Sequence, residues 1–302
     1  MIESILLTAA RVFTFEQKRL LTTASGFFFE RDERLFLVTS RHVMFDEPSK
    51  HFPDRIEIEL HIDPENLAKS TGFSIPLYRD RKSVWRQGED ASGDIDVAVI
   101  ELERKALPQN TMYRAFTPEH LPRPDKDVEI GSSVLVVGFP LGFHDTLHHM
   151  PVVRHAVIAS SFGLRFQGEG YFLTDARTHR GTSGAPVVMR LPKPVPQPAD
   201  AANDPSASEL PWMLLGVHSA RLDVGSRDLE ADEALGLNCA WYADILLTLT
   251  KADAAASPDA RAATGTVTDP LKTMPAPPAV TTPETPPPQA PAACSPAGTK
   301  EP

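Results

Sequence analysis

The sequence predicts an all-β fold that is closed by one C-terminal helix and followed by a disordered tail. Short apolar runs rich in Val, Ile, Phe and Thr alternate with turn signals through residues 1–250, a pattern typical of β-strands. Apolar residues make up 41% of the 302 residues, enough to bury a sizeable core. Twelve of the 29 prolines lie in residues 251–302, where Ala, Pro and Thr dominate without apolar periodicity. That segment cannot bury enough surface to offset the entropy of ordering it.

The strands are expected where the apolar runs are bounded by turns. The runs are Ser4–Phe15, Ala24–Glu30, Leu35–Ser40, Arg55–Ile62, Ile95–Leu102, Val134–Gly138, Val152–Ser161, Tyr171–Asp175, Ala185–Met189 and Met213–Ser219. Long connections at 46–55, 78–93 and 190–211 separate some of them, and loops on a rigid β scaffold often carry functional sites. The one helical signal is Ala243–Ala252, which places Ile245, Leu246, Leu249 and Leu247 on one apolar side.

Charge and hydropathy exclude several classes of function. Thirty basic and forty acidic residues give a net charge of -10 without a block of like charges, so nucleic-acid binding is not expected. The longest apolar stretch, near Val134–Phe143, is broken by glycine and proline and is shorter than the ~20 residues of a membrane-spanning helix. No basic segment or cleavage site typical of a secretory signal opens the chain. Cys239 and Cys294 are the only cysteines, which predicts no disulfide framework and a cytoplasmic location.

Three segments carry residues suited to chemistry. Residues 35–43 form an apolar strand that ends in a polar turn with His42. Residues 93–100 place Asp96 at the start of a nearly continuous apolar strand, where a partly buried carboxylate needs a hydrogen-bond donor. Residues 180–187 place Ser183 between Gly181 and Gly184, so the backbone can curl and direct amides toward the space beside the serine oxygen.

Each segment alone also fits an ordinary structural role. The histidine fits a hydrogen-bonded turn, the aspartate a strand cap, and Gly-Thr-Ser-Gly a simple turn. Their joint occurrence in the order His42, Asp96, Ser183, with separations of 54 and 87 residues, is unusual. Asp94 is a rival acid, because it precedes Asp96 by two residues and faces the same side of a strand. Asp96 is preferred because it directly adjoins the apolar run that begins at Val97.

These segments resemble the trypsin-like (chymotrypsin-fold) serine peptidases, especially the bacterial disulfide-free branch with the HtrA-like and glutamyl endopeptidases. Residues 37–42 resemble the strand leading to the catalytic histidine, residues 96–100 the catalytic aspartate motif, and residues 181–186 the nucleophile loop. Residues 24–27 are similar to an early strand of that family, and residues 137–142 to the opening of its second barrel. The likeness spans about residues 5–250.

The resemblance implies two six-stranded antiparallel barrels with the active site between them. Residues 1–115 would form the first barrel, residues 116–252 the second barrel with the terminal helix, and residues 253–302 the tail. His42 would act as general base, Asp96 would hold its tautomer, and Ser183 would be the nucleophile. The backbone N–H groups of Gly181 and Ser183 would form the oxyanion hole.

The resemblance also bears on the substrate. Residues 215–219 resemble the pocket strand of glutamate-specific members, which use a histidine at the place of His218, and Thr178 matches their pocket threonine. Thr178, Arg180, His218 and Ser219 are therefore the candidate substrate-binding residues, with Arg177 and Arg221 adding positive charge for an acidic P1 residue. The alternative is that His218 is a wall residue and the arginines are solvated.

The sequence thus predicts a serine endopeptidase that acts on proteins or peptides through an acyl-enzyme. No cofactor or metal is expected: His144 and His148 have i, i+4 spacing, but no acid or cysteine at metal-ligand spacing supports a site. The alternative is a latent or inactive peptidase-fold binding or scaffold protein, regulated by a partner that docks on the tail or the loops.

Overall fold

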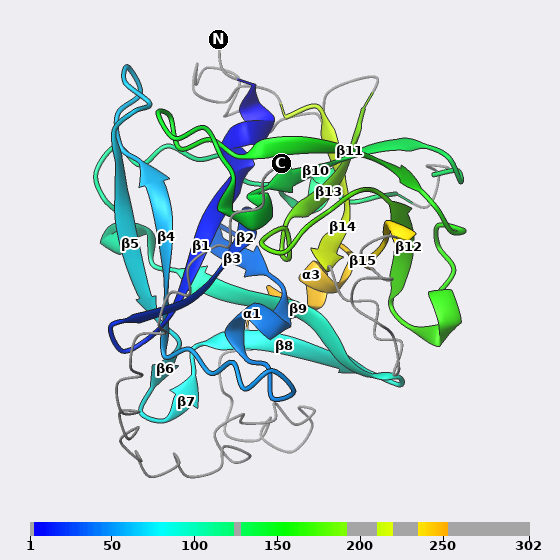
Figure 1. The fold of residues 1–302 in the computed structure, drawn as a ribbon, viewed down its shortest axis with the longest axis horizontal. Helices are drawn as coiled ribbons and strands as arrows, with labels where there is room; N and C mark the ends of the chain where they lie inside the picture. Colours follow the sequence, from blue (N-terminus) through cyan, green and yellow to red (C-terminus); the bar gives the residue numbers. More distant parts are fainter. Residues whose placement is uncertain (1–2, 124–127, 192–209, 220–234, 253–302) are drawn as a thin grey trace, which may run out of the picture.

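The molecule consists of two antiparallel β assemblies that pack against each other (Figure 1). The computed structural model describes residues 3–123, 128–191, 210–219 and 235–252. The prediction of a mainly β fold with few helices is confirmed. The predicted tail, residues 253–302, and most of the 190–211 connection lie outside the described residues.

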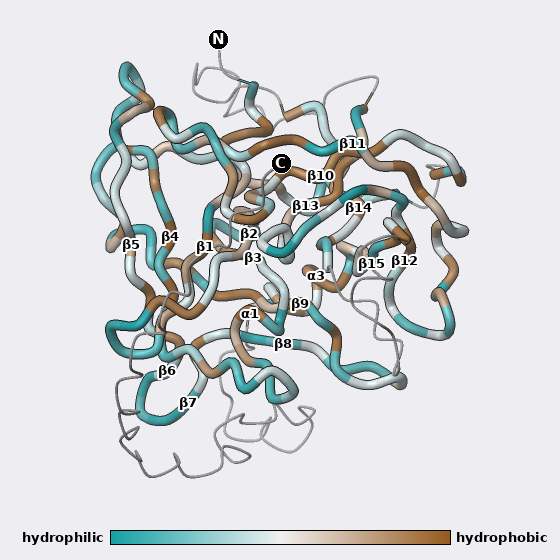
Figure 2. The backbone as a smooth tube through the Cα atoms, viewed as in Figure 1, coloured by the Kyte–Doolittle hydropathy of each residue, from teal (hydrophilic) through white to brown (hydrophobic). Residues whose placement is uncertain are grey.

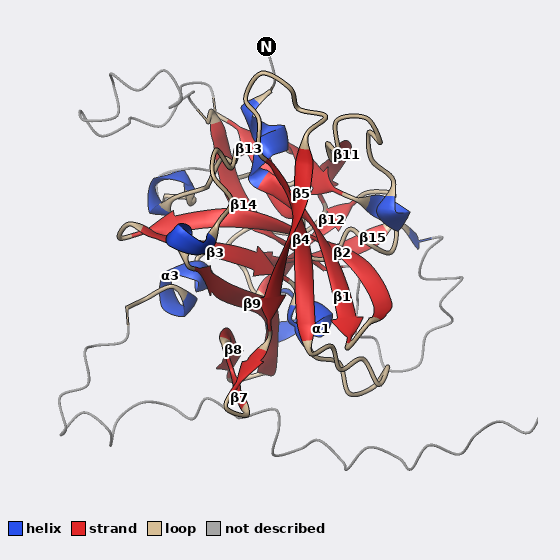
Figure 3. Cartoon of the chain, turned by 90° about the vertical axis from the view of Figure 1, so that its left-hand side faces the viewer, coloured by secondary structure: helices blue, strands red, loops and turns tan. Residues whose placement is uncertain are grey.

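The N-terminal half forms a seven-stranded sheet in the order β5-β4-β1-β2-β3-β9-β8. Its strands are β1 (Ala9–Glu16), β2 (Arg19–Arg31), β3 (Arg34–Thr39), β4 (Arg55–His61), β5 (Ser70–Pro76), β8 (Trp85–Asp90) and β9 (Gly93–Leu102). No pairing among the described strands joins β5 to β8, so the six-stranded barrel expected in this half is not confirmed. Seen after a 90° turn, β4 and β5 lie in front of the barrel strands β12 and β15 (Figure 3).

The C-terminal half is a closed barrel in the order β10-β11-β12-β15-β14-β13, so one of the two predicted barrels is confirmed. Its strands are β10 (Ser133–Gly138), β11 (Val152–Ile158), β12 (Tyr171–Asp175), β13 (Pro186–Arg190), β14 (Trp212–Ser219) and β15 (Leu237–Tyr242). Short 3-10 turns connect the larger elements; they are η2 (Arg104–Ala106), η3 (Pro118–His120), η4 (Pro140–Gly142) and η5 (Phe166–Gly168).

Two segments differ from the strand pattern predicted from the sequence. The run Ser4–Phe15 opens with a 3-10 helix, η1 (Ser4–Thr8), in which the Thr8 hydroxyl donates to the carbonyl of Ile5 at 2.7 Å. The 78–93 connection is not a plain loop. It contains the two-stranded sheet of β6 (Tyr78–Arg79) and β7 (Lys82–Ser83), and then β8.

The predicted terminal helix exists but is shorter than the apolar pattern suggested. Helix α3 spans Ile245–Leu249, and Leu246 and Leu249 are buried. Leu247 is 39% exposed, so its placement on the apolar side was wrong. The Arg86 guanidinium, from β8, donates to the carbonyl of Lys251 at 2.8 Å, which ties the end of the barrel half to the N-terminal sheet.

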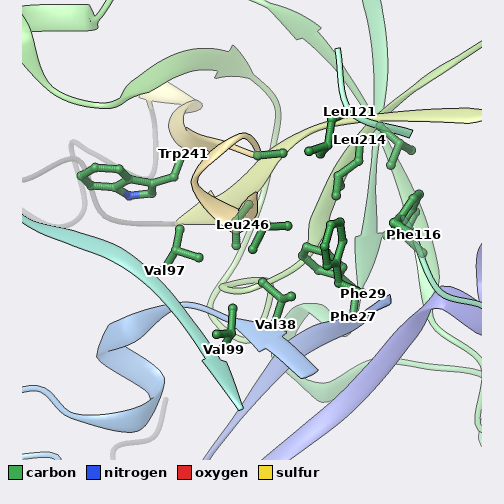
Figure 4. Packing of buried hydrophobic residues seen from close by; sticks show 14 of the residues in the cluster. Phe27, Phe29, Val38, Val97, Val99, Phe116, Leu121, Leu214, Trp241 and Leu246 are labelled. Atoms are coloured by element: carbon green, nitrogen blue, oxygen red, sulfur yellow. The ribbon is translucent and has the colours of Figure 1, made fainter. Parts of the chain in front are cut away.

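A hydrophobic core shared by the two halves fixes their relative position (Figure 4). Phe27 and Val97 come from the sheet, Leu214 and Trp241 from the barrel, and Leu246 from α3. Hydrophobic stretches lie along the strands, and hydrophilic ones mark outer turns such as the β6–β7 turn (Figure 2). Because close-packed side chains resist displacement, polar groups on facing strand ends are held in constant geometry.

Candidate active site

His42 and Asp96 meet because their strands are neighbours. Strand β3 pairs with β9 in antiparallel register, with Thr39 opposite Ala98, so the end of β3 lies beside the start of β9. The chain leaves β3 through the short helix α1 (Arg41–Met44), which carries His42. The Nδ1 atom of His42 lies 2.7 Å from Oδ2 of Asp96, and the backbone N–H of His42 donates to Oδ1 at 2.9 Å.

A third donor comes from the barrel: the Ser219 hydroxyl bonds to Oδ2 of Asp96 at 2.7 Å. Burial raises the pKa of the Asp96 carboxyl, but the charge of His42 and the hydrogen bonds from His42 and Ser219 outweigh it and hold the pKa below its ordinary value. The ionised carboxylate only accepts hydrogen bonds, so Nδ1 of His42 is the donor. Nε2 is then the ring nitrogen that can accept a proton.

Asp94 is engaged elsewhere. Its Oδ2 atom forms an ion pair with the Arg41 guanidinium at 2.7 Å, and its side chain is 43% exposed, against 20% for Asp96. The same strand therefore carries two acids with different partners: Asp94 pairs with Arg41, and Asp96 pairs with His42. The structure brings His42 together with Asp96 and not with Asp94.

The loop that carries Ser183 depends on two glycines with positive φ. Gly181 has φ +91° and Gly184 has φ +86°, backbone conformations that other residues rarely adopt. A Cβ on Gly184 would lie 2.2 Å from the carbonyl oxygen of Ser25, so a side chain cannot be placed there. The backbone consequently curls around Ser183, whose residue surface is 7% exposed.

The end of strand β14 joins this loop to the His42 segment. The carbonyl of His218 accepts hydrogen bonds from the Gly184 amide at 2.8 Å and from the Ser40 hydroxyl at 3.2 Å. Gly184 directly follows Ser183, and Ser40 lies two residues before His42. One carbonyl thus links the segments that carry the serine and the histidine, and the next residue, Ser219, contacts the aspartate.

The amide groups expected to bind an oxyanion donate to no acceptor within the described part of the protein. Neither the Gly181 nor the Ser183 backbone N–H donates a hydrogen bond to another described residue. The Ser183 hydroxyl is likewise not hydrogen bonded to His42 in this structure. Such contacts are often long in unliganded enzymes and shorten when substrate binds.

The predicted substrate-binding residues fall into different environments. His218 is fully buried, and neither ring nitrogen has a hydrogen-bond partner among the described residues. Burial, together with the charge of His42, lowers the pKa of His218 to about 3, so its ring is neutral. Arg180 and Arg177 are exposed, and Arg221 lies outside the described residues.

Two of the predicted pocket contacts are already used within the protein. The Ser219 hydroxyl holds Asp96, and the Thr178 hydroxyl donates to the side-chain oxygen of Asn238. Asn238 was not identified from the sequence. Its amide donates to the carbonyls of Ala176 at 2.8 Å and Gly236 at 3.1 Å, which orients it toward Thr178. No local motif marks Asn238, because its partner Thr178 lies 60 residues away.

Within the described ranges, no group of three or more His, Cys, Asp or Glu side chains is arranged to hold a metal ion. His148 pairs with Asp145, and His149 pairs with Glu59, so two of the clustered histidines have single acidic partners. None of the described helices combines the length and the apolar character needed to span a bilayer.

The chain has structural similarity to the serine endoprotease from Yersinia pestis, with a TM-score of 0.45 and 16% identity over 81% of this chain. It spans 62% of that protein's length. An inactive, mutant form of Rv3671c from M. tuberculosis gives a TM-score of 0.41 and 13% identity over 82% of this chain and 86% of its own. A search among curated proteins found no match.

The family model of the trypsin-like peptidase domain matches residues 24–191, more than half of the chain. That range contains the His42, Asp96 and Ser183 segments, and it agrees with the resemblance derived from the sequence. The predicted enzyme class, a trypsin-like hydrolase, is that of the matched family. The chain is therefore a member of the trypsin-like serine peptidase family.

Proposed function

We propose that this protein is a serine endopeptidase that hydrolyses peptide bonds through an acyl-enzyme, with Ser183 as nucleophile, His42 as general base and Asp96 as its orienting acid. The observation that carries the proposal is the junction at His218 and Ser219, where one strand end contacts the segments of all three residues. A turn, a strand cap and a Gly-rich loop with only structural roles would not need to converge on one strand end.

In the first half of the reaction, the Ser183 oxygen attacks the carbonyl carbon of the scissile peptide. Nε2 of His42 takes the hydroxyl proton, since Nδ1 is committed to Asp96. The carbonyl oxygen becomes an oxyanion that the Gly181 and Ser183 amides stabilise, and loss of one such donor typically costs about 3–4 kcal/mol. The C–N bond then breaks, and His42 returns the proton to the leaving amine nitrogen, leaving an ester on Ser183.

In the second half, water attacks the ester carbon and gives one proton to Nε2 of His42. The same two amides bind the second oxyanion. When the C–O bond to Ser183 breaks, the proton passes from His42 to the serine oxygen, and the product acid leaves. Asp96 stays ionised throughout and stabilises the transient imidazolium, in keeping with its lowered pKa.

The geometry favours an active enzyme over a latent scaffold. In a latent form, the loop between Gly181 and Ser183 would have its amides turned toward protein acceptors or buried against them. Here both amides are without protein acceptors among the described residues, and Thr182, between them, accepts a hydrogen bond from the Ala185 amide at 3.0 Å. This bond holds the peptide that carries the Ser183 amide.

A preference for acidic P1 residues is part of the proposal, and His218 supports it. The His218 ring is fully buried and has no hydrogen-bond partner among the described residues, which is costly, so a substrate carboxylate that displaced the groups covering the ring would satisfy it. Because the ring is neutral in the empty site, a carboxylate would bind together with a proton taken up by His218. Hydrolysis after glutamate should therefore weaken as pH rises, relative to hydrolysis after glutamine.

We also propose a cytoplasmic location, because the one cysteine in the described part of the chain, Cys239, is a free and buried thiol. Burial raises the pKa of Cys239 to about 12, so the thiol is not a nucleophile near neutral pH. Ser183 is then the nucleophile of the proposed reaction, and Cys239 does not compete with it.

The direct test is labelling of purified protein with a fluorophosphonate probe. Wild type should be labelled, Ser183→Ala should not, and Ser92→Ala, which alters an exposed serine elsewhere, should be labelled like wild type. Labelling that persists in folded Ser183→Ala, or that is missing from folded wild type, would contradict the proposal. A peptide library then tests specificity: cleavage mainly after Lys, Arg or large apolar residues would remove the acidic preference.

A further inference from the structure

Ser25 lies on β2 of the N-terminal sheet and is fully buried, and its hydroxyl and its amide are paired around the nucleophile loop, while its carbonyl accepts from the Thr39 hydroxyl. Its hydroxyl donates to the carbonyl of Gly181 at 2.7 Å and accepts from the Phe139 amide at 2.9 Å. Its own amide donates to the carbonyl of Ser183 at 3.0 Å. One residue from the other half of the molecule therefore holds the carbonyls of both residues whose amides would bind the oxyanion.

The peptide on the other side of Gly181 is also held. The carbonyl of Arg180 accepts a hydrogen bond from the Leu141 amide at 2.6 Å. In a trans peptide the C=O and N–H groups point in opposite directions, so fixing the Arg180 carbonyl fixes the direction of the Gly181 amide. Leu141 adopts φ +52° in the turn η4, a conformation that costs free energy in a residue with a side chain.

Gly181 needs such external restraints because a glycine backbone rotates with little steric resistance. Its φ of +91° excludes most other residues, and a Cβ there would lie 2.6 Å from the Phe139 carbonyl oxygen. The Ser25 hydroxyl is packed just as closely, since a Cβ on Gly138 would lie 2.6 Å from its oxygen. There is thus no room for a larger group where the Ser25 hydroxyl meets the strand end at Gly138 and the loop at Gly181.

We propose that Ser25 is a positioning residue for the oxyanion hole. Its hydroxyl restrains the peptide that follows Gly181, while the Leu141 amide restrains the peptide that precedes it, so the Gly181 amide stays directed at the developing oxyanion. The inference rests on the proposed peptidase function. It also means that the hole is assembled before substrate or any partner binds, and that its assembly depends on the N-terminal sheet.

The test compares Ser25→Ala with a matched control, Thr8→Val, in the full chain. The Thr8 hydroxyl is also fully buried and also donates to a carbonyl at 2.7 Å, but it lies in η1. The measurements are kcat and KM for a fluorogenic peptide that wild type cleaves, and inhibition by the peptide aldehyde of the same sequence, which forms an oxyanion-bearing adduct with the serine. Chemical unfolding reports the stability of each variant.

Ser25→Ala should lower kcat by at least about tenfold, since one oxyanion donor is worth about a hundredfold or more, while KM changes less than about twofold. Inhibition by the aldehyde should weaken in parallel with kcat. Thr8→Val should lose stability but retain kcat. If Ser25→Ala does not fold, Ser25→Gly, which removes the hydroxyl without placing a larger group in the closely packed site, should show the same loss of kcat.

The inference is overturned if folded Ser25→Ala or Ser25→Gly keeps wild-type kcat, if KM rises in place of a fall in kcat, or if Thr8→Val loses as much kcat. Failure of the underlying function looks different, because wild type itself would then neither cleave peptides nor react with a fluorophosphonate. Cleavage by wild type with no effect at Ser25 would remove only the positioning role.

Discussion

The Ser219 hydroxyl donates a 2.7 Å hydrogen bond to Oδ2 of Asp96, and this bond joins the barrel strand β14 to the sheet strand β9. Among the described residues, it is the one hydrogen bond of Asp96 that comes from the other half of the molecule, and it adds to the two bonds from His42. A carboxylate that is 20% exposed needs several donors to remain ionised. The acid is thus prepared only when the two halves are packed together.

We predict that Ser219→Ala destabilises the protein by about 1–3 kcal/mol, the cost of removing a donor from a mostly buried charged acceptor. The loss of activity should be smaller than in Asp96→Asn, because His42 keeps both of its bonds to Asp96. Urea unfolding and kcat/KM measure the two effects. A Ser219→Ala variant with wild-type stability would show that this bond does not stabilise the fold.

The same bond predicts a change in acid stability. The folded-state pKa of Asp96 is lowered, so the stabilisation from its ionised form is present above the unfolded-state value near 3.9 and is lost as pH falls through the folded value. Ser219→Ala removes one of the bonds that lower the pKa, so its acid unfolding should begin at a higher pH than that of wild type. Fluorescence-monitored unfolding against pH tests this, and an unchanged midpoint would contradict it.

Asp96→Asn and Asp94→Asn should separate the two neighbouring acids. Asp96→Asn should lower kcat by up to about 10⁴-fold, because the amide cannot hold the required histidine tautomer. Asp94→Asn removes an exposed ion pair to Arg41 and should change kcat/KM by less than about threefold. Thermal unfolding of both variants controls for folding. Loss of turnover in Asp94→Asn with retention in Asp96→Asn would reverse the assignment.

Gly184→Ala should unfold or inactivate the nucleophile loop, whereas Gly163→Ala should be tolerated. Both glycines have nearly the same φ, +86° and +85°, so an alanine carries the same backbone cost of about 1–2 kcal/mol at each. Only at Gly184 would the new Cβ also clash, 2.2 Å from the Ser25 carbonyl oxygen, while nothing lies within 4 Å at Gly163. Fluorophosphonate labelling and urea unfolding compare the two variants, and equal behaviour would argue against a tightly packed loop.

His218 should make stability depend on pH between about 6.5 and 3. Burial, with the charge of His42, lowers its folded-state pKa to about 3, below the unfolded-state value, so the unfolded chain binds the extra proton in this range. The free energy of unfolding should therefore fall with decreasing pH by about 1.4 kcal/mol per unit from this residue. His218→Leu should remove that slope, and His155→Gln, at an exposed position, should not. Equal slopes in all three proteins would exclude a neutral buried His218.

Much of the architecture follows from local patterns in the chain. Alternating apolar residues give the strands, and the run at residues 97–100 is apolar throughout because β9 is buried in the sheet between β3 and β8. Two other strands, β5 and β8, could not be predicted from apolar patterns, for physical reasons. Strand β5 carries Ser, Thr and Gly because it is an edge strand, and β8 is mostly polar although Trp85 is buried.

The candidate site shows the same division. Position next to a strand end made His42 and Asp96 visible in the sequence, and flanking glycines made Ser183 visible. The choice between Asp96 and Asp94 needed the structure, because strand alternation puts both on one side and only the place of Arg41 separates them. The hydroxyl of Ser219 was expected to face substrate, yet its partner is an acid 123 residues away.

The sequence by itself determined the mainly β class, the family, and the three segments that hold the serine, the histidine and the acid, because each depends on residues adjacent in the chain. Tertiary structure alone decided that the first half is a seven-stranded sheet, which acid contacts His42, and that Ser25 holds the Gly181 carbonyl across 156 residues of chain. Such hydrogen bonds form only where the two halves pack against each other. Their partners are far apart in the chain, so no local pattern of side chains predicts them.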